Sequence, residues 1–371
     1  MSATEPVAVS LVGLIAGGRA GIARYAVCLT RAVDEVAAEF PDLRLTLITN
    51  QSGSDAVDAR RVAVRDFRLP RGHFEAGPPR IALEQVLAGA SRGDLLHFFD
   101  LTAPGLTPWR PFVATVHDVS LGSGLSRRRH AYKRALWPWA ARRARRLVAV
   151  SEFAAGEASA RFGIPAEKVE VIPSGPGLAA PSAAGADGAH ERPFFLYVGD
   201  LTTRKNVPFL VHAFDRADLD ADLLLVGNAD DDASADVRAA VDRARNRQRI
   251  RIVGSLSDSD VDALYRSALA LLMPSRYEGF GFTPLEAMAR GCPVVESDIP
   301  ALREISGAGA LLVPVDDEPL WAESLRRVAG DEALRADLRA RGAETVRRYS
   351  WQDTARALCR LFLRVGSAAR R

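Results

Sequence analysis

The sequence predicts an α/β protein with two doubly wound, parallel-sheet halves, because three features of the chain agree. Short apolar runs of strand length alternate with helical patterns, and these runs are continuously hydrophobic, as is typical of strands buried on both faces of a parallel sheet. The chain has 371 residues, more than one domain comfortably holds. Residues 176–193 are rich in Pro, Ala and Gly without periodicity, which indicates a linker in the middle of the series.

Each half carries its own set of predicted strands. Those of the first half are Ala8–Leu14, Leu43–Ile48, Leu95–Phe99, Phe112–Val116, Leu147–Val150 and Val169–Ile172. Those of the second half are Phe194–Val198, Leu223–Val226, Ile250–Val253, Ala268–Pro274, Pro293–Glu296 and Ala310–Val313. Helical patterns dominate from Pro319 onward. We therefore expect a first domain over residues 1–178, a linker over 179–193, a second domain over 194–350 and a C-terminal helix over 351–371.

Composition excludes several classes of protein. The chain is 48% hydrophobic and 26% charged with a net charge of only +3, which gives no case for a nucleic-acid binder. Its three cysteines are scattered and form no CxxC pair, which argues for a reducing compartment and against a disulfide framework or a zinc site. The apolar run at residues 8–15 follows no basic segment and is too short to span a bilayer, so we expect a cytoplasmic protein.

The most informative segment is Ser275–Asp298, which carries two carboxylates, Glu278 and Glu286, with seven residues between them. A glycine-aromatic turn, residues 279–282, follows the first. A helix start comes next, with Thr283 predicted at the N-cap, Pro284 at N1 and Glu286 at N3. Since apolar runs flank the segment, the loop is predicted to open at the carboxyl end of a buried strand, where open α/β sheets bind ligands.

The chemistry of this loop suits a sugar joined to a phosphate. Glycines let the backbone approach a ligand closely, and N–H groups at a helix start favour an anion. Carboxylates accept hydrogen bonds from vicinal hydroxyls. Two structural alternatives stay open, because Thr283 and Glu286 could form a capping box and Glu278 could be a solvated loop acid.

A second candidate site follows the Phe194–Val198 strand. After Gly199 and Asp200 come Arg204 and Lys205, just before Asn206, which is a predicted helix N-cap. Two cations there can neutralise a diphosphate and stabilise a departing nucleotide. Only three of the 49 basic residues are lysines, so a lysine retained here suggests a specific task. The alternative is an ordinary basic loop.

The loop after the first strand contains Gly17 and Gly18. It is not a Walker A loop, because Arg19 and Ala20 stand where the lysine and the hydroxyl residue belong. It does not match GxGxxG either, and the second strand ends at Asn50 without the acid that would hold a dinucleotide ribose. The alternative to a ligand loop is a tight turn.

His117 follows the Phe112–Val116 strand and is expected to face an interdomain cleft, unless it is a helix-capping or core histidine. His97, one strand away, could line the acceptor side, but it is better explained as a packed strand residue.

Three further stretches have competing structural readings. In the 254–260 turn, Ser257 or Asp258 could simply cap the next helix. The acidic run 230–232 is interpreted as a solvated loop rather than a metal site, since it lacks further ligands at useful spacing. Residues 127–146 are basic and contain Trp137 and Trp139, which predicts either contact with an anionic membrane surface or a solvated helix with a core-facing tryptophan.

The Glu278–Glu286 block resembles the E-x7-E motif of the retaining glycosyltransferases of family 4, which have the GT-B fold of two Rossmann-like domains. The stretches GIARY, TVHD and SEF…RFGIP…VIP also resemble this family. Two departures are visible: Ala23 replaces a glycine, and the loop 173–177 differs from the family's PNGVD.

The resemblance implies roles for individual residues. It implies catalytic roles for Glu278, His117, Arg204 and Lys205. It implies donor binding by Gly17, Gly18, Gly199, Arg204, Lys205, Ser255, Leu256, Glu278, Gly279, Phe280, Gly281, Phe282, Thr283 and Glu286. In that family the first Glu contacts the transferred sugar and the second holds the ribose. The turn at residues 254–260, with Ser255 and Leu256, resembles the turn whose backbone atoms read the nucleobase in that family. It further implies that the last helix crosses back to the first domain, and that neither a metal nor another cofactor is needed.

The branch most similar to this chain is rich in mannosyltransferases that build O-antigens, lipopolysaccharides and exopolysaccharides. The resemblance therefore implies a hexose, first of all mannose from GDP-mannose, moved to a glycan or lipid-linked acceptor. The protein would then be cytoplasmic, with the 127–146 helix at the inner face of the membrane. A transferase acting on an aminoglycoside-type natural product is the alternative, followed by a GT-B-like sugar-nucleotide epimerase and a non-catalytic sugar-nucleotide binder.

Overall fold

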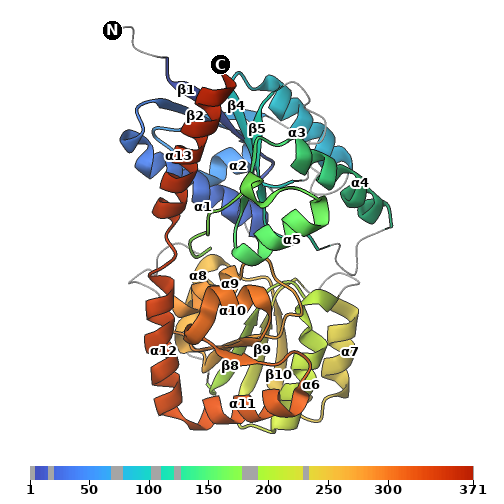
Figure 1. Cartoon of the computed structure of the whole chain (residues 1–371). Coiled ribbons are helices and arrows are strands. Elements are labelled where there is room, and N and C mark those ends of the chain that lie inside the picture. Colours follow the sequence, from blue (N-terminus) through green and yellow to red (C-terminus); the bar gives the residue numbers. More distant parts are fainter. Residues whose placement is uncertain are drawn as a thin grey trace. The chain divides into compact units, whose positions relative to one another are not determined.

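The computed structural model describes residues 5–15, 21–67, 78–101, 110–120, 127–177, 191–228 and 234–370. The chain divides into two compact units (Figure 1). The first unit comprises Met1–Leu121, Leu125–Gly177 and Tyr349–Arg371, and the second comprises Gly122–Gly124 and Leu178–Arg348. Each unit is a parallel sheet covered by helices, so the predicted fold class is confirmed.

The first unit has a seven-stranded sheet of order β3-β2-β1-β4-β5-β6-β7. Its strands are β1 (Val7–Val12), β2 (Leu43–Asn50), β3 (Ala63–Phe67), β4 (Leu95–Phe98), β5 (Phe112–Val116), β6 (Arg146–Ala149) and β7 (Val169–Val171). Its helices are α1 (Gly21–Val36), α2 (Gln51–Ala56), α3 (Pro78–Ala90), α4 (Arg127–Arg143), α5 (Glu152–Phe162) and α13 (Trp351–Ala369).

The second unit has a six-stranded sheet of order β10-β9-β8-β11-β12-β13. Its strands are β8 (Phe194–Val198), β9 (Asp222–Val226), β10 (Ile250–Gly254), β11 (Ala270–Met273), β12 (Val294–Ser297) and β13 (Leu311–Val313). Its helices are α6 (Val207–Ala217), α7 (Ala235–Arg243), α8 (Asp258–Ser267), α9 (Phe282–Met288), α10 (Pro300–Ser306), α11 (Glu318–Gly330) and α12 (Glu332–Val346).

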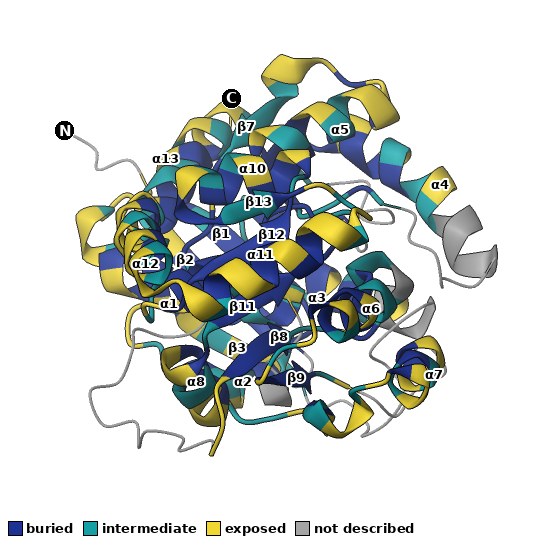
Figure 2. Cartoon of the chain, turned by 90° about the horizontal axis from the view of Figure 1, so that it is seen from below, coloured by how far each residue is buried: buried dark blue, intermediate teal, exposed yellow. Residues whose placement is uncertain are grey.

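Every strand predicted from the continuous apolar runs is present, and its ends differ from the prediction by no more than two residues. The sequence missed β3, which lies at the edge of the first sheet. Its residues are exposed or half-buried, so it has no continuous apolar run to reveal it. Figure 2 shows the contrast, with the central strands buried and the outer helix faces exposed.

The last helix, α13, belongs to the first unit and packs against α1 and β1 (Figure 1). Polar contacts fix its outer face, since Gln352 Nε2 lies 2.7 Å from Glu35 Oε2 and Arg356 Nε lies 2.9 Å from Glu39 Oε2. Close packing fixes its inner face, because a Cβ on Gly366 would lie 2.3 Å from Val7 Cγ1.

The start of α13 also explains the unusual loop at residues 173–177. A Cβ on Gly175 would lie 2.5 Å from the Trp351 ring, so only glycine fits there. Trp351 Nε1 donates to the Pro176 carbonyl at 2.6 Å, and Thr354 Oγ1 donates to the Pro173 carbonyl at 2.6 Å. This loop is therefore shaped by its packing against α13.

In the part of the chain that the structure describes, no helix is long and apolar enough to cross a membrane. None of the three cysteines, all of which lie in the described residues, forms a disulfide.

Candidate active site

Two predicted segments of the second unit meet at one sheet edge. Glu278 follows β11 and Lys205 follows β8, and these two strands are parallel neighbours. Lys205 Nζ lies 2.6 Å from Glu278 Oε1, and Arg204 Nη1 lies 3.2 Å from Glu278 Oε2. Arg204 Nη1 also donates to the Tyr277 carbonyl at 2.8 Å. The fold thus joins an acid and two cations separated by more than seventy residues of sequence.

Burial decides between the readings of Glu278. Its exposed fraction is 7%, so the interpretation as a solvated loop acid is wrong. Burial by itself would raise the pKa of Glu278, but the charges of Lys205 and Arg204 outweigh it and hold the pKa below its ordinary value. The carboxylate is therefore ionised at neutral pH and accepts hydrogen bonds.

Tyr197 on β8 forms a hydrogen bond with the loop that leads to Arg204 and Lys205. Its hydroxyl donates to the Asp200 carbonyl at 2.7 Å, and the side chain is fully buried. Burial, followed by the charge of Glu278, raises the pKa of Tyr197 well above its ordinary value. The phenol consequently stays protonated and keeps its donor role.

Gly199 and Asn206 lie at the two ends of the loop that carries Arg204 and Lys205. Gly199 has a φ of +153°, and a Cβ on Gly227 would lie 2.0 Å from its carbonyl oxygen. Asn206 stands at the N-cap of α6, as predicted, but does not cap through its side chain; its Nδ2 instead donates to Asp316 Oδ1 at 2.9 Å. Arg276 Nη2 pairs with Asp316 at 2.8 Å, and this ties the loop after β8 to the loop after β11.

The glycine turn departs from the prediction in one respect. The N-cap of α9 is Gly281, not Thr283, and Thr283 lies inside the first turn. Gly281 has a φ of +113°, which other residues rarely adopt, so the chain enters the helix two residues earlier than the hydroxyl pattern suggests. Gly281 has no side chain, so the N-cap residue itself supplies no capping side-chain hydrogen bond.

Glu286 does not form the capping box either. It is 5% exposed, and its Oε2 accepts a hydrogen bond at 3.1 Å from the hydroxyl of Tyr265 on α8. Burial and then the charge of Glu286 raise the pKa of Tyr265 well above its ordinary value, so the phenol remains a donor. The capping interpretation is thus wrong, because a long-range partner has taken the place of the local one.

The turn after β10 contains Ser255 and Leu256, behind Gly254, whose φ is +79°. Ser257 is the N-cap of α8 and accepts from the Asp260 N–H at 3.2 Å. The capping alternative for Ser257 is confirmed, and base recognition by Ser255 and Leu256 stays a prediction.

In the first unit, His117 lies just after β5. Its Nε2 is 2.8 Å from the Phe99 carbonyl, which can only accept, so Nε2 carries the proton and Nδ1 remains the acceptor of the ring. The ring of Tyr25 meets it edge-on at 4.6 Å. Burial lowers the pKa of His117, although the Phe99 carbonyl, Asp100 and Asp118 oppose this. The imidazole is therefore neutral at pH 7.

His97 is a packed strand residue, as predicted. It is fully buried, its Nε2 lies 3.0 Å from Thr115 Oγ1, and burial lowers its pKa to about 3.

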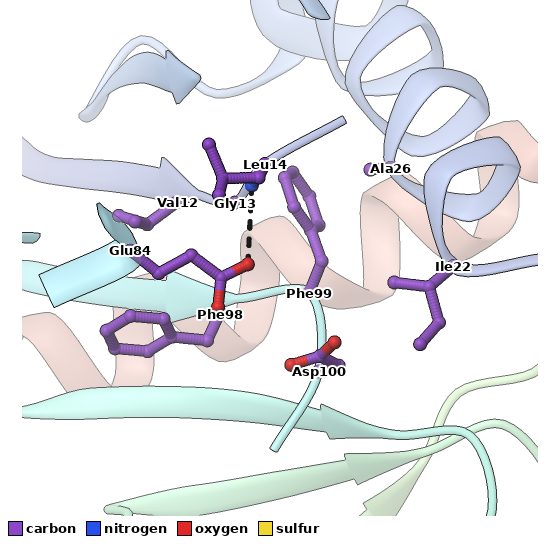
Figure 3. A pocket seen from close by; sticks show the side chains of 9 residues that line it. All are labelled: Val12, Gly13, Leu14, Ile22, Ala26, Glu84, Phe98, Phe99 and Asp100. Carbon is purple, nitrogen blue, oxygen red and sulfur yellow. Dashed lines mark hydrogen bonds between the residues drawn. The ribbon is translucent and has the colours of Figure 1, made fainter. Parts of the chain in front are cut away.

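A small pocket of the first unit lies at the carboxyl ends of β1 and β4 and is lined by α1 and α3 (Figure 3). It contains two acids that the sequence reasoning passed over. Glu84 on α3 is buried and accepts from the Leu14 N–H at 3.4 Å, and Asp100 follows β4 directly. Two features of the sequence could have identified these acids: Glu84 is an acid on the apolar face of a helix, and Asp100 is an acid at the carboxyl end of a strand.

The basic helix is shorter than predicted, because α4 ends at Arg143 and Arg146 already begins β6. Trp137 is 6% exposed and packs on Phe162, so the core-facing tryptophan of the alternative reading is present. Trp139 is 38% exposed and lies 5.4 Å from the Arg143 guanidinium.

Several predictions fall outside the described residues. These are Gly17 and Gly18 of the first loop, the acidic run 230–232 and most of the linker, residues 179–190.

Known proteins resemble this chain over both units. The model of Glycosyltransferase Family 4 matches residues 21–176, and that of Glycosyl transferases group 1 matches residues 186–345. The phosphatidyl-myo-inositol mannosyltransferase of Mycobacterium leprae is 31% identical over 296 residues, which cover 74% of each chain. The O-antigen chain mannosyltransferase B of Escherichia coli is 30% identical over 226 residues, covering 57% of this chain and 58% of the relative.

A solved structure supports the same fold. The Anabaena protein Alr3699/HepE in complex with UDP-glucose superposes with a TM-score of 0.75 at 19% identity, covering 95% of this chain and 98% of that one. The chain therefore belongs to the group 1 glycosyltransferases of family 4, which have the GT-B fold.

Proposed function

We propose that this protein is a retaining hexosyltransferase that moves mannose from GDP-mannose to a hydroxyl of a glycan or lipid-linked acceptor in bacterial polysaccharide synthesis. The observation that carries the proposal is the cluster of Lys205, Arg204 and ionised Glu278 at one sheet edge. The names of the mannosyltransferase relatives support the choice of sugar.

In this proposal Lys205 and Arg204 bind the diphosphate of the donor. The bond between the anomeric carbon and the phosphate oxygen breaks while the acceptor oxygen forms a bond on the same face. The departing phosphate takes the acceptor's proton. Charge grows on that phosphate in the transition state, and two preorganised cations stabilise it without a metal.

Glu278 holds hydroxyls of the transferred sugar, since an ionised, buried carboxylate is an acceptor whose position is fixed by its cations. Glu286 holds the ribose, oriented by the Tyr265 hydroxyl. The backbone of Gly279–Phe282 and Thr283 contacts sugar and phosphate, and Ser255 with Leu256 contacts the base. Gly199 keeps the strand end close to the donor, and the family resemblance assigns Gly17 and Gly18, which lie outside the described residues, to donor binding.

His117 contacts the transferred sugar near the reacting carbon. Its neutral state suits this role, because a neutral imidazole offers a hydrogen bond without attracting the leaving phosphate away from the cations. The exposed part of α4, with Trp139 and Arg143, contacts the inner face of the cytoplasmic membrane and so brings the enzyme to a lipid-linked acceptor.

Thermal-shift measurements with GDP-, UDP-, dTDP- and ADP-sugars test the donor. We expect stabilisation by GDP-mannose and GDP. Stabilisation by UDP-glucose, the ligand of the Anabaena protein, with no effect of GDP would overturn the mannosyl assignment. Conversion of a sugar nucleotide without any acceptor would indicate an epimerase, and transfer only to aminoglycoside-type acceptors would redirect the acceptor assignment.

A further inference from the structure

A second carboxyl group lies under the sugar site, and none of the roles above uses it. Glu296 on β12 is fully buried. Its register partners are Met273 on β11 and Leu312 on β13, so the three side chains lie in one layer on the same face of the sheet.

That layer supports the glycine turn. Met273 packs with Leu302 of α10, and a Cβ on Gly281 would lie 3.0 Å from Leu302 Cδ2. Glu296 is therefore placed beneath the turn that follows Glu278. The two register partners of Glu296 are apolar, and the buried hydroxyl that acts on Glu296 is that of Ser306 on α10.

The two carboxyl groups have opposite surroundings. Glu278 has Lys205 and Arg204, whereas neither oxygen of Glu296 forms a hydrogen bond of ordinary geometry within the described part of the chain. An ionised carboxylate in such a place is very costly, so the group keeps its proton instead. Burial, and the charge of Glu278 after it, raise the pKa of Glu296 to about 8, while the Ser306 hydroxyl opposes this.

We propose that Glu296 is a protonated positioning residue, whose neutral form leaves Lys205 and Arg204 to Glu278 and the donor diphosphate, and whose ionisation weakens donor binding. This inference rests on the proposed function, since it assumes that a diphosphate binds these cations. A second negative charge behind Glu278 repels the diphosphate through a poorly screened interior.

The charges around Glu296 agree with this reading. Of the charged groups around it, Glu278 is the one that acts on its pKa. Other charged groups of the second unit have partners of their own: Glu286 with Tyr265, Arg303 with Asp298, Arg341 with Asp337 and Arg348 with the Ile305 carbonyl.

Calorimetric titration of the full chain with GDP and with UDP between pH 7 and pH 9 tests the inference. We expect the ratio of the Kd at pH 9 to the Kd at pH 7 to be roughly tenfold larger in the wild type than in Glu296→Gln. The comparison of ratios removes the titration of the nucleotide, which is the same in both experiments. Glu304→Gln, which removes an acid from α10 outside the buried layer, is the matched control and should behave as wild type.

A second variant keeps the test decisive if Glu296→Gln folds poorly. Because the Ser306 hydroxyl lowers the pKa of Glu296, Ser306→Ala should move the midpoint of the affinity loss to higher pH. Equal ratios in wild type and Glu296→Gln, or an unmoved midpoint in Ser306→Ala, would overturn this inference and leave the proposed function standing. Absence of binding of either nucleotide at pH 7 would instead overturn the proposed function and this inference with it.

Discussion

The carboxyl ends of the strands carry different charges in the two sheets. At the edge of the second sheet, Glu278 is held between Lys205 and Arg204, and every group is charged. At the edge of the first sheet, His117 is neutral, bonded to a backbone carbonyl and packed against Tyr25. Under the proposed function this difference would be a division of labour, in which Lys205 and Arg204 of the second unit bind the charged diphosphate and the neutral His117 of the first unit contacts the sugar.

The largest expected effect on activity comes from removing one of the charged side chains of the second unit's site. Lys205→Ala and Glu278→Ala should each lower kcat/KM for sugar transfer by at least about two orders of magnitude, because the transition-state charge loses a preorganised partner. Steady-state transfer assays measure this, with circular dichroism to show that each variant is folded.

Arg216→Ala is the matched control for Lys205→Ala, since Arg216 is an exposed cation on the same stretch of chain that pairs with Glu318. It should keep normal turnover. Near wild-type turnover in both Lys205→Ala and Glu278→Ala would contradict the assignment of this edge.

The next effect concerns stability against pH. The folded pKa of Glu296 is about 8, above the ordinary value of about 4.3 for an unfolded chain. Between these values the unfolded chain has released the proton that the folded protein retains, so this group's contribution to stability is lost as pH rises. The slope is roughly 1.4 kcal/mol per pH unit.

Glu296→Gln removes that dependence and should be more stable than wild type at pH 7 by on the order of 2–4 kcal/mol. At pH 4 the two proteins should be similar. Urea unfolding without ligand across pH 4–8 measures the difference, and a constant difference between the two proteins would show that Glu296 is not protonated.

Replacing the neutral His117 should lower turnover without changing the affinity for the nucleotide. His117→Gln should lower kcat by roughly tenfold or more while the Kd for GDP stays unchanged, because His117 belongs to the other unit from the cations. Calorimetry and kinetics on the same preparation check both quantities. His97→Gln controls for a general disturbance of the first sheet, and a matching loss of GDP affinity in His117→Gln would contradict the division of labour.

The smallest expected effect tests the support of the ribose site. Tyr265→Phe deletes the hydroxyl that donates to Glu286 and should weaken nucleotide binding by roughly fivefold, the worth of one buried hydrogen bond. The Kd should weaken equally for GDP and UDP, since both carry a ribose. A loss confined to one nucleotide would assign Glu286 to the base rather than to the sugar.

Sequence patterns predicted the structure correctly where neighbouring residues in the sequence determine it. Continuous apolar runs located the strands, and Ser257 caps α8 as its position suggests. They failed at Thr283, because Gly281 can adopt a positive φ and begins the helix earlier. They failed for Glu286, because its partner Tyr265 is 21 residues away.

The sequence by itself determined the fold class, the carboxyl-end loops and the residue types that a sugar-phosphate site needs, since periodicity and loop glycines are local properties of the chain. Only the tertiary structure decided the protonation states. Glu278 and Glu296 are both buried glutamates of the same unit, yet one is ionised beside two cations and the other holds its proton. That outcome depends on which distant side chains the fold brings to each carboxyl group, and the pattern around either residue does not contain this information.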